Sequence, residues 1–175
     1  MMRVRQTVKL QMNKFAQDEI IEKGLSDSFD PWDYRDRLEA QAEGKCYITI
    51  VAVPPALMPR DVSGLVINIT EEDGPEEYVI LYSVDADGVL LWRILFHELG
   101  HIVLFHVSDP GSFIALRKQS LPGLVALSKP EEGEAEFFSS AMSMYATFGI
   151  PSKADGSTTR QSIDGFVSRM SWKEA

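Results

Sequence analysis

The most constraining feature of the chain is the stretch LFHELGHIVLFH at residues 95–106. Its two histidines, His97 and His101, stand four positions apart, and in an α-helix such residues lie on one face, roughly 40° apart around the axis. Both imidazoles can then reach a single metal ion. Glu98 lies roughly 100° around the axis from His97, where its carboxylate would contact a water bound to that ion. The pattern therefore predicts a metal-binding helix with Glu98 as the general base.

The alternative is a buried core helix that carries two histidines for packing alone. The chain has three histidines, and two of them stand in this motif. Two imidazoles and a glutamate in an apolar helix would be costly to bury without a polar task. Gly100 costs the helix roughly 1 kcal/mol relative to alanine, so we expect it to permit the close approach of a neighbouring strand or helix. These observations favour the metal site.

A third ligand must come from another segment. On a continuous helix His106 lies roughly 140° from His101, so we do not expect it to reach the same ion. The remaining candidates are a carboxylate or the single cysteine, Cys46. The carboxylates cluster in PEEGEAEFFSSAMSMY at residues 130–145, where Glu132 and Glu136 share one helical face. Glu134 falls among the apolar positions of that helix and is a rival ligand.

The same segment carries small side chains that would let its helix pack closely against the motif helix: Ala135, Ser139, Ser140 and Ala141. A solvent-exposed face for Glu132 and Glu136 is the alternative. Tyr145 and His106 are candidates for stabilising an oxyanion, and a structural role is the alternative for each.

The remaining pattern predicts an α+β domain in which helices surround a small three-stranded sheet. Runs rich in Val, Ile and Tyr predict the strands, and Pro, Gly and capping residues such as Asp30 and Asp87 delimit the helices. The expected helices are 13–23, 31–43, 88–107, 129–148 and 157–172; the expected strands are 46–53, 64–69 and 78–84; and residues 108–130 are expected to be mostly loop.

Composition excludes several classes of partner. The net charge is −9, with a pI near 4.8, so direct binding to nucleic acid or to an anionic membrane surface is disfavoured.

One cysteine cannot form an internal disulfide. The basic start of the chain is not followed by an apolar signal segment, and no run approaches the roughly 18 apolar residues of a membrane helix. We therefore expect a cytoplasmic protein.

Together, the segments WRILFHELGHIVLFH and EGEAEFFSSAMSMY resemble the ImmA/IrrE family of metallopeptidases. Aligning Ala135 with the alanine of the family pattern puts Glu132 on the metal-binding glutamate. The upstream segments VSGLVINI and YVILYSVDADG resemble the two strands that lead into the family's active-site helix. The chain departs from the pattern at Glu136, which replaces an asparagine, and at Tyr145, which replaces a proline.

The resemblance implies a gluzincin-like zinc endopeptidase that holds one zinc ion through His97, His101 and Glu132. We expect a single zincin-like domain over residues 29–150, an N-terminal helical extension over 1–28, and a C-terminal helix over 151–175 that packs on the same domain. The family implies a protein substrate, a helix-turn-helix repressor encoded nearby. A metal-bound module that sequesters such a regulator without cleaving it is the alternative. Glu136, Tyr145 and His106 would support the ligands or the transition state, and a substrate strand would add to a free edge of 64–69 or 78–84.

Overall fold

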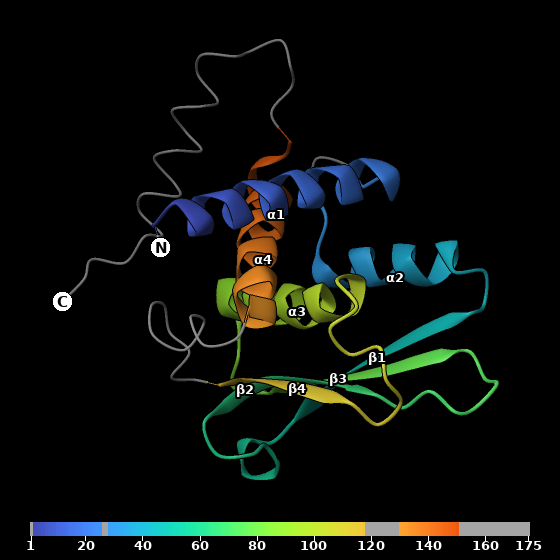
Figure 1. Cartoon of the computed structure of the whole chain (residues 1–175). Coiled ribbons are helices and arrows are strands. Elements are labelled where there is room, and N and C mark those ends of the chain that lie inside the picture. Colours follow the sequence, from blue (N-terminus) through green and yellow to red (C-terminus); the bar gives the residue numbers. More distant parts are fainter. Residues whose placement is uncertain (1, 26–27, 118–129, 151–175) are drawn as a thin grey trace.

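The computed structural model describes residues 2–25, 28–117 and 130–150. It is a mixed α+β arrangement, as predicted, in which a mostly antiparallel sheet carries helices on one face (Figure 1). Helix α3 (Gly88–Val103) lies against the sheet, α4 (Pro130–Phe148) crosses α3, and α1 (Met2–Glu22) packs against α4. The motif helix is therefore enclosed between the sheet and another helix.

The described sheet has four strands rather than the predicted three. They are β1 (Cys46–Val53), β2 (Val62–Asn68), β3 (Glu76–Ser83) and β4 (Phe113–Arg117), in the spatial order β1-β3-β2-β4. β1 runs parallel to β3, whereas β2 is antiparallel to both β3 and β4. The prediction that β2 or β3 offers a free edge is wrong, because both are interior strands.

β4 was missed because its segment was predicted to be loop. The run FIALR is short and is followed by a proline-containing stretch. Backbone pairing with β2 supplies what local propensity does not: Ile67 stands opposite Phe113, and Val66 opposite Ile114. This strand depends on a partner that is distant in sequence, so its own residues give little signal.

The helices are α1 (Met2–Glu22), α2 (Pro31–Gln41), α3 (Gly88–Val103) and α4 (Pro130–Phe148), with a short 3-10 turn at Pro55–Leu57. α1 begins far ahead of the predicted residue 13. α2 begins as predicted, with a capping box between Asp30 and Asp33. Asp87 stands at the N-cap of α3, but its side chain makes no capping hydrogen bond. The predicted helix over 157–172 lies outside the described residues. None of the helices within the described ranges is both long and apolar enough to cross a membrane.

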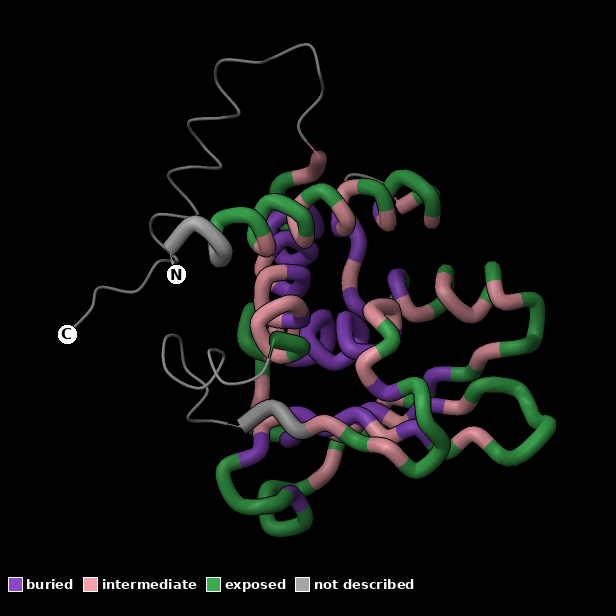
Figure 2. Tube along the Cα trace, viewed as in Figure 1, coloured by how far each residue is buried: buried purple, intermediate pink, exposed green. Residues whose placement is uncertain are grey.

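The main core lies between the sheet and the helices and is continuous with α1 (Figure 2). Phe15 of α1 packs on Phe138 of α4 with ring centroids 5.8 Å apart, so the N-terminal helix shares this core. Leu65 lies in a smaller cluster with Met58 and Val62, whereas Val66 belongs to the main core. Successive residues of β2 thus serve opposite faces of the sheet.

α3 and α4 approach closely at Gly100, as predicted. A Cβ atom on Gly100 would lie 2.9 Å from Cδ1 of Phe138 and 3.6 Å from Cα of Ala135. Larger side chains at this contact would separate the two helices. Because Gly100 and Ala135 are small, the first turns of α4 can pack directly against the motif residues of α3. The cost of glycine to the helix is offset by this packing.

α3 ends at Val103, four residues before the predicted residue 107. The amide of His106 donates to the carbonyl of His101 over 2.9 Å, and the amide of Phe105 donates to that of Ile102 over 3.0 Å. This pair of bonds is a Schellman motif, which places Phe105 at the position that favours glycine. Phe105 has a φ of 58°. His106 is thereby turned back toward the helix instead of continuing it.

Replacing Phe105 by glycine should stabilise the protein. A non-glycine residue in the left-handed region costs roughly 1–2 kcal/mol. Phe105 is 74% exposed, so its side chain contributes little packing. We expect Phe105→Gly to raise the free energy of unfolding by about 1 kcal/mol relative to Phe105→Ala, which keeps the strained Cβ. Denaturant unfolding measures both. Equal stability of the two variants would contradict the proposed strain.

Candidate metal centre

The motif residues lie in the buried half of α3. His97 is 1% exposed, and Glu98 and His101 are fully buried. The apolar residues around them in the helix (Ile94, Leu95, Phe96, Leu99 and Ile102) anchor it in the core. Packing therefore fixes the backbone from which the three polar side chains project.

Glu132, in the first turn of α4, completes a cluster with the two histidines. Its Oε2 lies 3.3 Å from Nε2 of His97, and its Oε1 lies 3.8 Å from Nε2 of His101. The two Nε2 atoms are 3.0 Å apart. Three potential ligand atoms, one from each residue, lie within 4.8 Å of one another. This group could hold a metal ion.

The donor set fits a divalent cation. Ligands at about 2.0–2.1 Å in tetrahedral geometry stand roughly 3.3 Å apart, close to the spacing between these side chains. Burial lowers the pKa of His101 to about 2, with further contributions from His97 and His106. His101 is therefore neutral and offers a lone pair at ordinary pH. A carboxylate and two imidazole nitrogens that converge on one point are best stabilised by a cation between them.

The other proposed ligands are not part of this group. Cys46 lies on β1, and burial, followed by the charges of Glu76 and Glu39, raises the pKa of its thiol to about 11. A thiol that stays protonated is a poor ligand. Glu134, the rival to Glu132, points its carboxylate to His106 instead, with Oε2 3.2 Å from Nε2.

Glu136 lies beside the other nitrogen of His97. Its Oε2 is 3.6 Å from Nδ1 of His97, and its Oε1 is paired with Nη2 of Arg93. Arg93 stands one turn before His97 on α3, so the ion pair joins α3 to α4 next to the cluster. The guanidinium holds this carboxylate near the ring. Sequence reasoning missed Arg93; its signal was a single cation inside the apolar run VLLWRILF.

His106 lies against His101, because α3 ends before residue 106 instead of continuing to residue 107 as predicted. Nδ1 of His106 is 2.9 Å from Nδ1 of His101. The early end of α3 is the physical reason, because the Schellman turn folds the chain back over the last helical turn. His106 is thus a neighbour of a candidate ligand.

The structure does not bring Tyr145 to the cluster. Its hydroxyl donates to Oδ1 of Asn13 and accepts from Nε2 of Gln17, each over 2.6 Å. Both partners belong to α1. Burial raises the pKa of Tyr145, and the two hydrogen bonds oppose that shift. Here the tyrosine joins α4 to the N-terminal helix.

Glu98 lies over β2 at Gly64. A Cβ on Gly64 would be 2.5 Å from Oε1 of Glu98 and 2.7 Å from Cγ2 of Ile94. The strand must therefore carry glycine for the glutamate to occupy its position. Sequence reasoning missed Gly64, although a lone glycine inside an apolar strand is typical of such a close approach.

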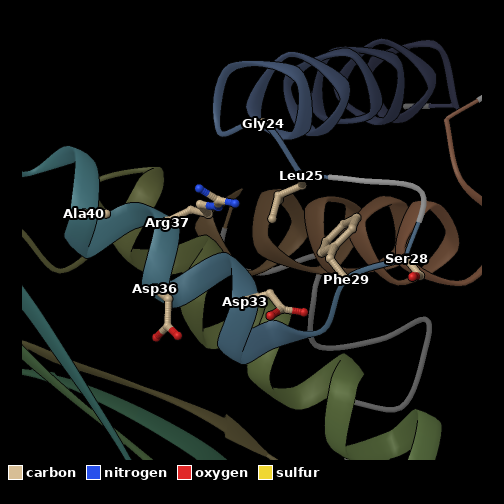
Figure 3. A pocket seen from close by; sticks show the side chains of 8 residues that line it. All are labelled: Gly24, Leu25, Ser28, Phe29, Asp33, Asp36, Arg37 and Ala40. Atoms are coloured by element: carbon tan, nitrogen blue, oxygen red, sulfur yellow. The ribbon is translucent and has the colours of Figure 1, made fainter.

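A separate depression lies between the end of α1 and α2 (Figure 3). Leu25 and Phe29 line its apolar part, and Arg37, Asp33 and Asp36 belong to its polar part. Its volume is about 570 Å³. No residue that lines it among the described ones belongs to the metal cluster, so it is not part of this site.

No family model matches the chain, and no curated protein matches it. The resemblance to the ImmA/IrrE family therefore rests on the motif residues themselves.

Metal binding should depend on Glu132. A metal that binds only the native state at 100 times its Kd stabilises by about 2.7 kcal/mol, so zinc should raise the melting temperature of the wild type. Glu132→Ala should lose most of this rise, because two histidines remain. Glu131→Ala, an exposed neighbour on α4, removes the same charge and should behave as wild type. Equal stabilisation of Glu132→Ala and wild type would refute the assignment.

Proposed function

We propose that this chain is a zinc-dependent endopeptidase with a zincin-like active site. The observation that carries the proposal is the position of Glu132, whose carboxylate lies 3.3 Å from Nε2 of His97 and 3.8 Å from Nε2 of His101. Two histidines from one helix and a glutamate from the next are the ligand set of gluzincin-type catalytic sites, which leave a position open for water or substrate. Membership of the ImmA/IrrE family is part of the same proposal.

Bound zinc would supply a Lewis acid that polarises the scissile carbonyl and acidifies a water. Glu98 would take a proton from the attacking water and return it to the leaving amine. Its burial against Gly64 restricts the positions that the carboxylate can occupy. A fixed base of this kind reduces the reorganisation that the reaction requires.

The proposed substrate is a regulatory protein, a helix-turn-helix repressor encoded nearby. The net charge of −9 supports this partner class, because DNA-binding proteins present basic surfaces to an acidic enzyme. A metal-bound module that sequesters the regulator without cutting it uses the same residues and differs in what Glu98 does. The experiment on Glu98 separates the two.

Glu98→Gln should abolish cleavage and leave metal binding intact. The amide keeps the shape and hydrogen bonding of the side chain but is no base, and losing a general base typically costs 10²–10⁴-fold in rate. The measurement is cleavage of the co-encoded regulator by zinc-loaded protein, alongside zinc content. A wild type that binds the regulator and never cleaves it, with Glu98→Gln indistinguishable in cells, would establish the sequestering module instead.

Gly64→Ala should impair cleavage, because it displaces the carboxylate of Glu98, and should leave zinc affinity unchanged, because it does not touch the metal ligands. The added methyl would meet the carboxylate and Ile94, and a displacement of about 1 Å near the reacting groups can cost roughly 10²-fold in rate. Overpacking should also lower stability by about 1–3 kcal/mol. Ser63→Ala, at the adjacent strand position, is the matched control. Zinc affinity and peptidase rate are measured together. Unchanged cleavage in Gly64→Ala would contradict the role given to this contact.

A further inference from the structure

His106 lies between a candidate metal ligand and a carboxylate. Its Nδ1 is 2.9 Å from Nδ1 of His101, and its Nε2 is 3.2 Å from Oε2 of Glu134. The side chain of His106 is 7% exposed, that of His101 is fully buried, and that of Glu134 is 36% exposed. These three side chains, His101, His106 and Glu134, therefore form a row that runs from the interior of the site to the protein surface.

The carboxylate of Glu134, at the surface end of this row, determines which ring nitrogens of His106 and His101 carry protons. A carboxylate only accepts hydrogen bonds, so the Nε2 of His106 that faces Glu134 must carry a proton. When His106 is neutral, it has one N–H and one acceptor nitrogen, so its Nδ1 accepts. Nδ1 of His101 must then donate, and the lone pair of His101 is left on Nε2. That nitrogen faces His97 and Glu132.

We propose that His106 and Glu134 are positioning residues that hold His101 in the tautomer and ring orientation in which its Nε2 binds the metal. The proposal rests on the metal site of the proposed function and deepens it. Ligating histidines commonly donate their second N–H to a carboxylate or carbonyl. Here an intervening histidine extends that link to a carboxylate that His101 does not contact itself.

The Nδ1 atoms of His97 and His101 have different neighbours, so the His106–Glu134 pair acts on His101 alone. The carboxylate of Glu136 lies 3.6 Å from Nδ1 of His97 and is held there by Arg93. Glu134 instead reaches His106. Glu132, Glu134 and Glu136 all project from the start of α4, so one helix supplies the candidate ligand and the carboxylates that lie beside His106 and His97.

The tautomers provide a direct test. The chain has only three histidines, so each ring can be assigned by substitution in ¹⁵N-labelled protein. Long-range ¹H–¹⁵N spectra of the metal-free and zinc-loaded protein should show His106 protonated at Nε2, and His101 protonated at Nδ1. A proton on Nδ1 of His106, or metal bound to Nδ1 of His101, would overturn the proposal.

Zinc affinity provides the second readout, measured by competition with a chromophoric chelator. Loss of such an indirect partner typically weakens metal binding roughly 10–100-fold, and we expect this for His106→Phe and for Glu134→Ala. His106→Asn should recover most of the affinity, because its amide oxygen can replace Nδ1 as the acceptor from His101. Glu131→Ala, which removes a charge from an exposed position on the same helix, should stay within threefold of wild type.

The outcomes separate this proposal from the function on which it rests. Affinity within threefold of wild type in folded Glu134→Ala would refute the role of the pair, even if the enzyme cleaves its substrate. A protein that binds zinc but never cleaves would refute the peptidase, while the affinity ranking would still support the pair. If the wild type binds no zinc, the proposed function fails, and the tautomers of the metal-free protein still decide whether the row is protonated as proposed.

Discussion

The close contact between α3 and α4 at Gly100 is the constraint on which the site depends. Without a Cβ at this position, Ala135 and Phe138 of α4 lie directly against the motif helix. The same approach brings Glu132 within 3.3 Å of Nε2 of His97. A larger residue at Gly100 would have to displace the ring of Phe138 or the backbone of α4. The packing of two helices thus determines the geometry of the candidate ligands.

Each polar group enclosed by this contact would be costly to bury alone. The contacts between His97, His101, Glu132 and His106 reduce that cost. His97 and His101 converge on the carboxylate of Glu132, and the outer nitrogen of His101 contacts His106. In a low-dielectric interior such contacts are strong, and a missing partner is expensive. We therefore expect the metal-free centre to be the least stable part of the core, because its converging acceptors lack their cation.

The sequence predicted what local patterns encode. The shared face of His97 and His101 follows from helical periodicity, and the close approach at Gly100 follows from the cost of glycine inside a helix. β1 matches its predicted bounds because its run is bounded by clear turn residues. β4 was not predicted, because its stability comes from pairing with β2, which is distant in sequence. His106 was misplaced because a phenylalanine occupies the left-handed position that ends α3, where glycine is the usual signal. Gly64 and Arg93 gain their meaning only from contacts across the fold.

The most direct test of the central claim is a crystal structure of the zinc-loaded protein with anomalous data collected at the zinc absorption edge. We expect one strong peak bonded to Nε2 of His97, Nε2 of His101 and a carboxylate oxygen of Glu132. A peak bonded to Glu134 or Cys46, with Glu132 turned away from the metal, would contradict it. So would zinc-loaded crystals without a peak between the two histidines.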